Sequence, residues 1–199
     1  MPVPRAIERS VARAAAGFPV LAITGPRQSG KSTLARRAFP DLPVVNLEDP
    51  DRRAFAESDP RGLLHTVADG AIIDEVQRVP QLLSYLQGLV DADGRCGRFV
   101  LTGSSQLHLD AEVTQSLAGR VGHLRLLPFS HVELAAAGAA PADLDTWLFT
   151  GGYPPIYDRA VAPDLWLASY VDSYLQRDVR QLLAVGDLGA FGTFLRVCA

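Results

Sequence analysis

The sequence has few cysteines and no long hydrophobic run. Its two cysteines, Cys96 and Cys198, lie far apart with no ligand pattern around them, so neither a disulfide framework nor a zinc site is predicted. No stretch reaches the roughly 20 consecutive apolar residues that a membrane-spanning helix needs. The basic N-terminal residues are followed by no apolar core of the signal-peptide kind. We therefore expect a cytoplasmic protein with no membrane partner.

Lysine is almost absent from the chain. The 19 basic residues comprise 18 arginines and one lysine, Lys31, and the formal net charge is −3. This balance predicts no overall attraction to nucleic acid or to an anionic membrane, and leaves room only for a local basic patch. Because arginine is the usual cation here, single arginines carry little information, whereas the one position that keeps lysine is informative.

Short apolar runs alternate with helix-compatible segments through the first two thirds of the chain. A leading amphipathic helix is predicted over residues 4–16, where apolar residues recur at helical spacing. Five apolar runs of strand length follow: residues 19–24, 43–47, 71–74, 98–102 and 123–127. Continuous apolar strands separated by helices are typical of a parallel sheet covered on both faces. The fold class predicted for residues 1–130 is therefore α/β, in one domain.

The last third of the chain changes character. Residues 131–146 are rich in alanine, with Gly138 and Pro141 interrupting, and are predicted to form a short helix and a linker. Residues 147–199 carry apolar and aromatic side chains at helical spacing, so we expect the start of a helical C-terminal domain. The final apolar helix, from Phe191, has no stop signal, and we therefore expect a truncated chain.

A glycine-rich turn joins the first apolar run to a helix-forming segment. Gly25-x4-Gly30-Lys31-Ser32 matches the phosphate-binding loop pattern, and it lies between a strand and a helix as that pattern requires. The two glycines let successive backbone N–H groups point inward as an anion nest. The compact ammonium of Lys31 is expected on the β- and γ-phosphates of ATP, and the Ser32 hydroxyl on Mg²⁺. The nucleotide-binding candidates are Gly25, Pro26, Arg27, Gln28, Ser29, Gly30, Lys31, Ser32 and Thr33.

Polar side chains close the third and fourth apolar runs. Asp74 and Glu75 follow the third run, at the carboxyl edge where ligands of open α/β sheets bind. Asp74 is expected to accept a Mg²⁺-bound water, which completes the metal environment begun by Ser32, and Glu75 to polarise the attacking water. Thr102 and Ser104, at the end of the fourth run, are both candidates for a side chain that senses the γ-phosphate. Taken alone, these residues are also compatible with solvated acids and a Ser/Gly turn.

Seven stretches resemble, in order and spacing, an AAA+-type P-loop ATPase family of prokaryotes that carries a C-terminal domain of unknown function. They are GPRQSGKST, NLEDPDRR, GAIIDEVQRVPQLL, FVLTGSSQL, SLAGRVGHLRLLPFSHVEL, FTGGYPPIY and YVDSYLQRDV. The resemblance implies an ATPase core whose five-stranded parallel sheet has the order 5-1-4-3-2, within a longer parent protein. It also implies a role for Arg120, because such ATPases often place after the fourth strand an arginine that acts on the γ-phosphate, in cis or from a neighbouring subunit. A salt bridge or an exposed position is the alternative for Arg120.

Three classes of function fit a phosphate loop. The first is Mg²⁺-dependent ATP binding and hydrolysis that switches an attached domain or partner. The catalytic candidates for it are Lys31, Glu75, Thr102, Ser104 and Arg120. The second is a P-loop small-molecule kinase, which needs an arginine-rich lid that residues 103–125 supply poorly. A GTPase is disfavoured, because its guanine-binding Asn-Lys-x-Asp motif needs a second lysine that the chain lacks. The third, a module that holds ATP without turnover, is opposed by Glu75. A homo-oligomer, and a protein or nucleic-acid client contacted through the missing C-terminal part, stay open as partners.

Overall fold

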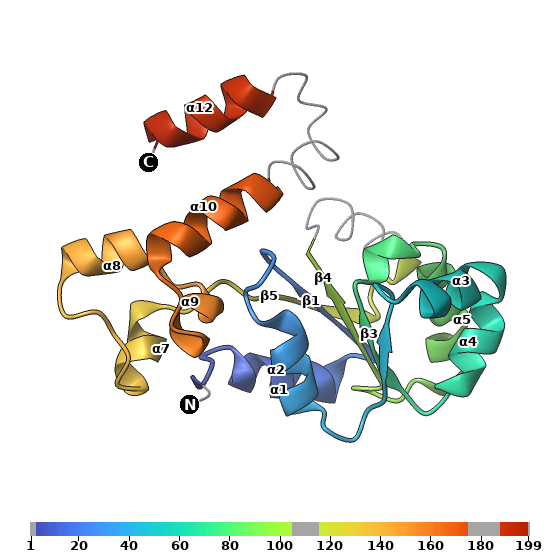
Figure 1. The fold of residues 1–199 in the computed structure, drawn as a ribbon. Coiled ribbons are helices and arrows are strands. Elements are labelled where there is room, and N and C mark those ends of the chain that lie inside the picture. The colour runs from blue at the N-terminus through green and yellow to red at the C-terminus, as the bar shows by residue number, and fades with distance from the viewer. Residues whose placement is uncertain (1–2, 105–115, 175–187, 199) are drawn as a thin grey trace.

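The computed structural model describes residues 3–104, 116–174 and 188–198, and its centre is a five-stranded parallel sheet. The strands are β1 (Val20–Thr24), β2 (Val44–Asn46), β3 (Ala71–Asp74), β4 (Phe99–Gly103) and β5 (Val121–Arg125). They lie in the order β2-β3-β4-β1-β5 (Figure 1). From the other edge this order is 5-1-4-3-2, so the predicted α/β class and sheet order are confirmed.

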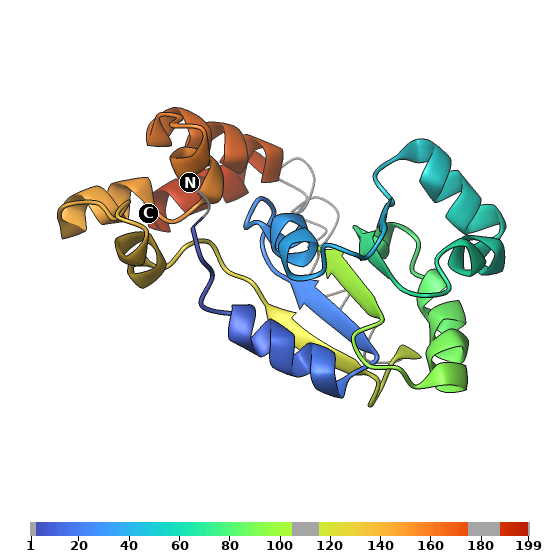
Figure 2. The same cartoon turned by 90° about the horizontal axis from the view of Figure 1, so that it is seen from below.

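Helices cover both faces of the sheet. Figure 2 shows two groups on opposite sides of the strands: α1 (Glu8–Gly17) with α2 (Lys31–Ala38), and α3 (Pro50–Ser58), α4 (Pro60–Thr66) and α5 (Leu82–Asp93). Alternate residues of β1 face the two groups, Leu21 and Ile23 toward the first and Val20 and Ala22 toward the second. Every residue of β1, β3 and β4 is buried, which explains why the sequence shows continuous apolar runs there.

The chain beyond β5 forms short helices beside the sheet. They are α7 (His131–Ala136), α8 (Leu144–Thr150), α9 (Pro154–Asp158), α10 (Pro163–Tyr174) and α12 (Leu188–Cys198). Three aromatic rings join the start of α9 to α10. The ring centroid of Tyr153 lies 4.7 Å from that of Trp166 and 4.8 Å from that of Tyr170, and the last two are 5.0 Å apart. Within the described residues, no helix combines the length and the apolar character of a bilayer span. The predicted domain boundaries at residues 130 and 146 stay predictions.

Among the predicted strands and the leading helix, two elements differ from the structure by more than one residue at an end. β5 begins two residues earlier than predicted, because Val121 pairs in register with Val20 at the start of β1. The chain leaves the sheet at Leu126, so the predicted end at residue 127 is also too late. The leading helix begins at Glu8 instead of residue 4. The segment before it is anchored to α7, since the N–H of Ala6 donates to Glu133 Oε1 at 2.7 Å.

Candidate nucleotide-binding site

The predicted phosphate loop joins β1 to α2. Gly25 has a φ of +148°, and a Cβ added there would lie 2.0 Å from the carbonyl oxygen of Leu126, so only glycine fits. Gly30 has a φ of +94° and directly precedes α2, so the loop ends where the helix begins. The positive end of the α2 dipole and its first N–H groups therefore face the loop, which is an arrangement suited to a phosphate.

The side chain of Lys31, the first residue of α2, folds back into the phosphate loop. The residue is 6% exposed, and its Nζ donates to the carbonyl oxygen of Pro26 at 2.8 Å. A buried ammonium is costly unless it has charged or polar partners. A loop of N–H groups with such a cation inside can therefore hold an anion strongly.

Side chains from α2 and β4 meet at the end of β3 on Asp74. Ser32 Oγ donates to Asp74 Oδ1 at 2.8 Å, and the hydroxyl of Thr102 donates to the same oxygen. The sheet order explains this convergence, because β4 lies between β3 and β1, and β1 leads into α2. Asp74 is 7% exposed and Thr102 is fully buried. Ser32 and Asp74 thus lie together, with Thr102 behind them.

Glu75 follows Asp74 in a different backbone conformation. Its φ of +57° is uncommon for a residue other than glycine. Its Oε2 accepts hydrogen bonds from Gln77 Nε2 and from Ser104 Oγ, the latter at 3.2 Å, and Gln77 Nε2 also donates to Ser104 Oγ at 3.4 Å. Of the two candidates at the end of β4, Ser104 is therefore the one that contacts Glu75. The sequence analysis missed Gln77, although it lies two residues after Glu75 in one of the seven stretches.

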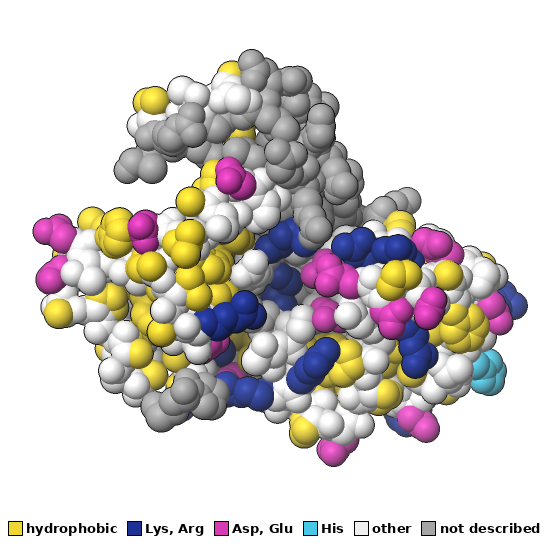
Figure 3. All heavy atoms as spheres, viewed as in Figure 1, with side chains coloured by type: hydrophobic (Ala, Val, Ile, Leu, Met, Phe, Trp, Pro, Cys, Tyr) yellow, Lys and Arg dark blue, Asp and Glu magenta, His cyan; other side chains and the backbone are white. Residues whose placement is uncertain are grey.

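A pocket of about 490 Å³ opens over the loop and is lined from both parts of the chain. One wall comes from the loop, α2 and two acids: Arg27, Gln28, Gly30, Lys31, Ser32, Thr33, Glu48 and Glu75. The other wall comes from α9, the residue after it and α10: Pro154, Pro155, Asp158, Arg159 and Ser173. Figure 3 shows basic side chains gathered in this hollow, with acidic side chains beside them. Ser29, a further predicted loop residue, is fully buried.

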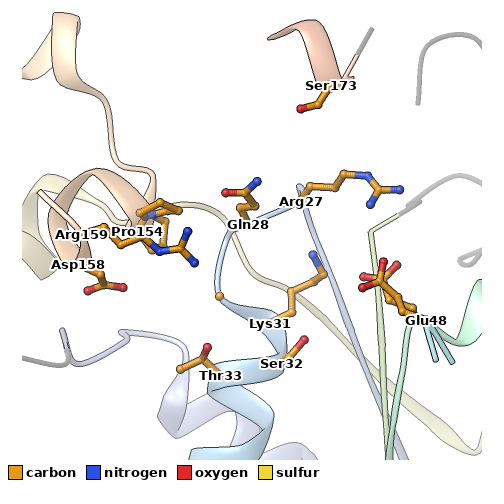
Figure 4. Close-up of a pocket in the computed structure, with 13 residues that line it drawn as sticks. Arg27, Gln28, Lys31, Ser32, Thr33, Glu48, Pro154, Asp158, Arg159 and Ser173 are labelled. Atoms are coloured by element: carbon orange, nitrogen blue, oxygen red, sulfur yellow. The ribbon is translucent and has the colours of Figure 1, made fainter. Parts of the chain in front are cut away.

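The second wall was not predicted from the sequence. Figure 4 shows Asp158 and Arg159 on one side of Lys31, Glu48 on the other side, and Ser173 across the pocket. The available signal was the stretch FTGGYPPIY, which contains the first four residues of α9. Parts of the stretches FVLTGSSQL and YVDSYLQRDV lie outside the described residues.

A smaller hollow of about 300 Å³ adjoins the pocket along α2. The two spaces share Gly30, Thr33, Pro154 and Asp158. The remaining walls of the hollow are Val3, Leu34, Phe129, Arg5 and Arg37. A largely apolar space next to an anion site can accept a flat apolar group that is attached to a phosphate chain.

Arg120 does not lie at the phosphate loop. It precedes β5 at the amino edge of the sheet, where its carbonyl accepts from the N–H of Val20 at 3.1 Å, whereas the loop lies at the carboxyl edge. Its guanidinium pairs with Asp91 of α5, with Nη2 2.9 Å from Oδ2. This hydrogen bond lowers the pKa of Asp91 and raises that of Arg120. Arg120 thus lies at the opposite edge of the sheet from the loop of its own chain, and its role on the γ-phosphate stays a prediction.

Known proteins resemble the chain over most of its length. A family model described as an AAA domain matches residues 17–135, and a domain of unknown function (DUF8612) matches residues 141–199. Uncharacterized protein Rv2008c of Mycobacterium tuberculosis and uncharacterized protein Mb2031c of Mycobacterium bovis are each 36% identical over 169 residues, which cover 82% of this chain and 37% of theirs. The chain thus spans little more than a third of the length of these relatives.

Solved structures share the fold at low sequence identity. The Walker-type ATPase PABY2304 of Pyrococcus abyssi matches 92% of this chain and 75% of its own, with a TM-score of 0.55 and 16% identity. The signal transduction ATPase PH0952 of Pyrococcus horikoshii, which has a tetratricopeptide repeat sensor, matches 87% of this chain and 33% of its own, with a TM-score of 0.51 and 17% identity. Since the AAA match covers more than half of the residues and the fold agrees, the chain belongs to the AAA-type P-loop ATPase family, with a C-terminal domain of unknown function.

Proposed function

We propose that this chain binds ATP with Mg²⁺ and hydrolyses it, and that hydrolysis changes the contact between the phosphate loop and the C-terminal helices. The observation that carries the proposal is the shared pocket, in which Lys31 and Glu75 face the same space as Pro154 and Arg159. A ligand in this space touches both parts of the chain. Loss of its terminal phosphate therefore changes the free energy of their contact.

The two adjoining spaces suit the two ends of the nucleotide. The loop N–H groups and Lys31 hold the phosphate chain. The adenine lies in the smaller hollow against Leu34, Phe129 and Pro154, whose apolar surfaces suit the faces of a base. Glu75 lines the larger pocket and not the hollow, which fits a position near the terminal phosphate.

The residues at the end of β3 fit Mg²⁺. The Ser32 hydroxyl and the Asp74 carboxylate are hard oxygen donors 2.8 Å apart, and oxygen ligands of this kind are what Mg²⁺ prefers. When bound, the cation neutralises charge on the β- and γ-phosphates. Ser32 and Asp74 hold it, and the buried Thr102 hydroxyl orients Asp74.

Glu75 orients and polarises the attacking water. Ser104 and Gln77 donate to its carboxylate, which fixes the direction in which that carboxylate accepts a proton. In a homo-oligomer, Arg120 of a neighbouring copy supplies positive charge to the terminal phosphate. A protein or nucleic-acid client, contacted through the C-terminal domain, receives the resulting movement.

The test measures nucleotide affinity and turnover separately. The wild-type chain should hydrolyse ATP, and chelation of Mg²⁺ should stop the reaction. Glu75→Gln should bind a fluorescent ATP analogue with unchanged affinity while kcat falls about 100-fold or more, because the base that polarises the water is lost. Lys31→Ala should lose affinity, whereas the control Arg36→Ala, which removes an exposed cation from the same helix, should not.

Two results would contradict the proposal. A wild-type chain that binds ATP without turnover, under conditions in which Glu75→Gln behaves identically, would indicate a module that only holds the nucleotide. Transfer of the phosphate to an added small molecule in preference to water would indicate a kinase.

A further inference from the structure

A buried arginine lies behind the phosphate loop. Arg5 precedes α1, and its side chain is 7% exposed. Figures 1 and 2 show the N-terminal segment beside α7, far from it in sequence. Arg5 Nη1 donates to the carbonyl oxygen of Ser29 at 3.0 Å, and Nε donates to Glu133 Oε1 at 3.1 Å. Nη2 donates to the carbonyl oxygens of Leu127 and Pro128, so three parts of the chain meet on one guanidinium.

The acid that pairs with Arg5 is itself fully engaged. Glu133 is 9% exposed. Its Oε1 also accepts from the N–H of Ala6 at 2.7 Å, and its Oε2 accepts from the N–H of Ser130 at 2.8 Å and from the Ser130 hydroxyl at 3.2 Å. A buried ion pair offsets its desolvation cost only when such additional hydrogen bonds are made. The ion pair therefore holds the backbone groups that bond to Arg5, at Ser29 and Leu127, in a fixed geometry relative to those that bond to Glu133, at Ala6 and Ser130.

The bond to Ser29 sets the direction of one loop N–H group. A trans peptide is planar, so its C=O and N–H point in opposite directions. Arg5 holds the carbonyl of Ser29 on the outer side of the loop, and the N–H of Gly30 in the same peptide must then point the other way. Gly30, with its φ of +94°, is the last loop residue before Lys31.

The same cluster reaches the second wall of the pocket. The guanidinium of Arg5 lies 4.8 Å from the ring centroid of Phe129. The N–H of Phe129 donates to the carbonyl oxygen of Gly152 at 2.7 Å, two residues before Pro154. Glu133 lies in the first turn of α7. Contacts thus run from the loop peptide to Arg5, from Arg5 to Phe129, and from Phe129 to the segment that carries Pro154.

We infer that Arg5 is a positioning residue that holds the phosphate loop in its anion-binding conformation and connects it to the C-terminal helices. The inference rests on the proposed function, because it acts through the phosphate loop. It goes beyond that function by assigning control of the loop to a residue outside every phosphate-binding pattern. Arg5 acts on the phosphates through the Ser29–Gly30 peptide.

The experiment uses inorganic tripolyphosphate and ATP as probes, because tripolyphosphate has no base. Arg5→Gln should weaken both probes about tenfold, since one loop N–H loses its fixed direction. Arg5→Lys should recover only part of this loss, because an ammonium does not reproduce the planar fork that meets Ser29, Glu133 and Leu127 together. The control is Arg9→Gln, which removes an exposed arginine of α1 and should leave both affinities unchanged.

A second variant keeps the test decisive if Arg5→Gln does not fold. Glu133→Gln leaves Arg5 and its bond to Ser29 in place, and it should weaken tripolyphosphate by a smaller factor, about threefold. If Arg5→Gln folds and its tripolyphosphate affinity stays within twofold of wild type, the inference is overturned. If Arg5→Gln does not fold, the same result in Glu133→Gln would overturn it. Loss of ATP affinity alone would also overturn it, because Arg5 would then contact the base in the smaller hollow. If the wild-type chain binds neither probe, the proposed function fails, and the inference fails with it.

Discussion

At the scale of single residues, two adjacent acids have different surroundings. Asp74 is buried, and one of its oxygens accepts hydrogen bonds from two hydroxyl groups. Glu75 accepts hydrogen bonds from the side chains of Gln77 and Ser104. β3 ends at Asp74, and the backbone at Glu75 is left-handed. The side chain of Glu75 therefore does not follow the alternation of side chains along β3. This local change gives the two neighbouring carboxylates separate surroundings, as the roles proposed for Asp74 at a metal and Glu75 at a water require.

Replacement of Thr102 by valine tests how Asp74 is oriented. The variant keeps the shape of the side chain but removes a buried donor to the carboxylate. We expect the apparent Mg²⁺ affinity in ATP turnover to fall about fivefold, which corresponds to about 1 kcal/mol for one hydrogen bond. Turnover at saturating Mg²⁺ should change little, and Thr102→Ser should behave as wild type. A Mg²⁺ titration of Thr102→Val that overlays the wild-type curve would show that the hydroxyl does not orient Asp74.

At the scale of elements, the strands that carry the site could be predicted and its second wall could not. β1, β3 and β4 are buried on both faces, so apolar composition alone marks them, and the carboxyl ends of parallel strands meet at one edge. β5 lies at the edge of the sheet with His123 and Arg125 exposed, and its weaker pattern explains the shift of two residues. α9 has five residues, and its place over the loop depends on packing between distant segments that no local pattern records.

The capping box of α7 is expected to make the fold sensitive to acid. Burial opposes the charged form of Glu133, but the N–H groups of Ser130 and Ala6 and the guanidinium of Arg5 outweigh it and lower the pKa of the carboxyl. A group whose pKa is lowered by folding stabilises the protein above its unfolded pKa, about 4.3 for glutamate. This contribution is lost as the pH falls through the folded pKa.

The measurement compares denaturant unfolding of wild type and Glu133→Gln across this range. The wild type should be more stable by about 2 kcal/mol near neutral pH, where the carboxylate is charged. The difference should shrink as the pH falls below about 4.3. A difference that keeps its size at every pH would show that the charge of Glu133 does not contribute.

At the scale of the whole molecule, the two parts of the chain are joined at two places. The pocket brings α9 and α10 to the phosphate loop, and the Arg5 cluster ties the loop to α7 from behind. A nucleotide between them therefore contacts a wall that is continuous with the C-terminal helices. Under the proposed function, this continuity is what would couple the C-terminal helices to the state of the phosphates.

Hydrogen exchange can follow this coupling directly. Addition of Mg²⁺ and a non-hydrolysable ATP analogue should slow amide exchange about tenfold or more in the phosphate loop and, at the same time, in α9 and the end of α10 around Ser173, because the ligand holds both walls together. The amides of α4, which lies on the other face of the sheet and outside the pocket, should keep their rates. Protection confined to the loop would mean that α9 and α10 do not take part in binding, so hydrolysis could not move them. Protection that appears in Arg5→Gln only at the loop, and in wild type at both walls, would place the connection at the guanidinium behind Ser29.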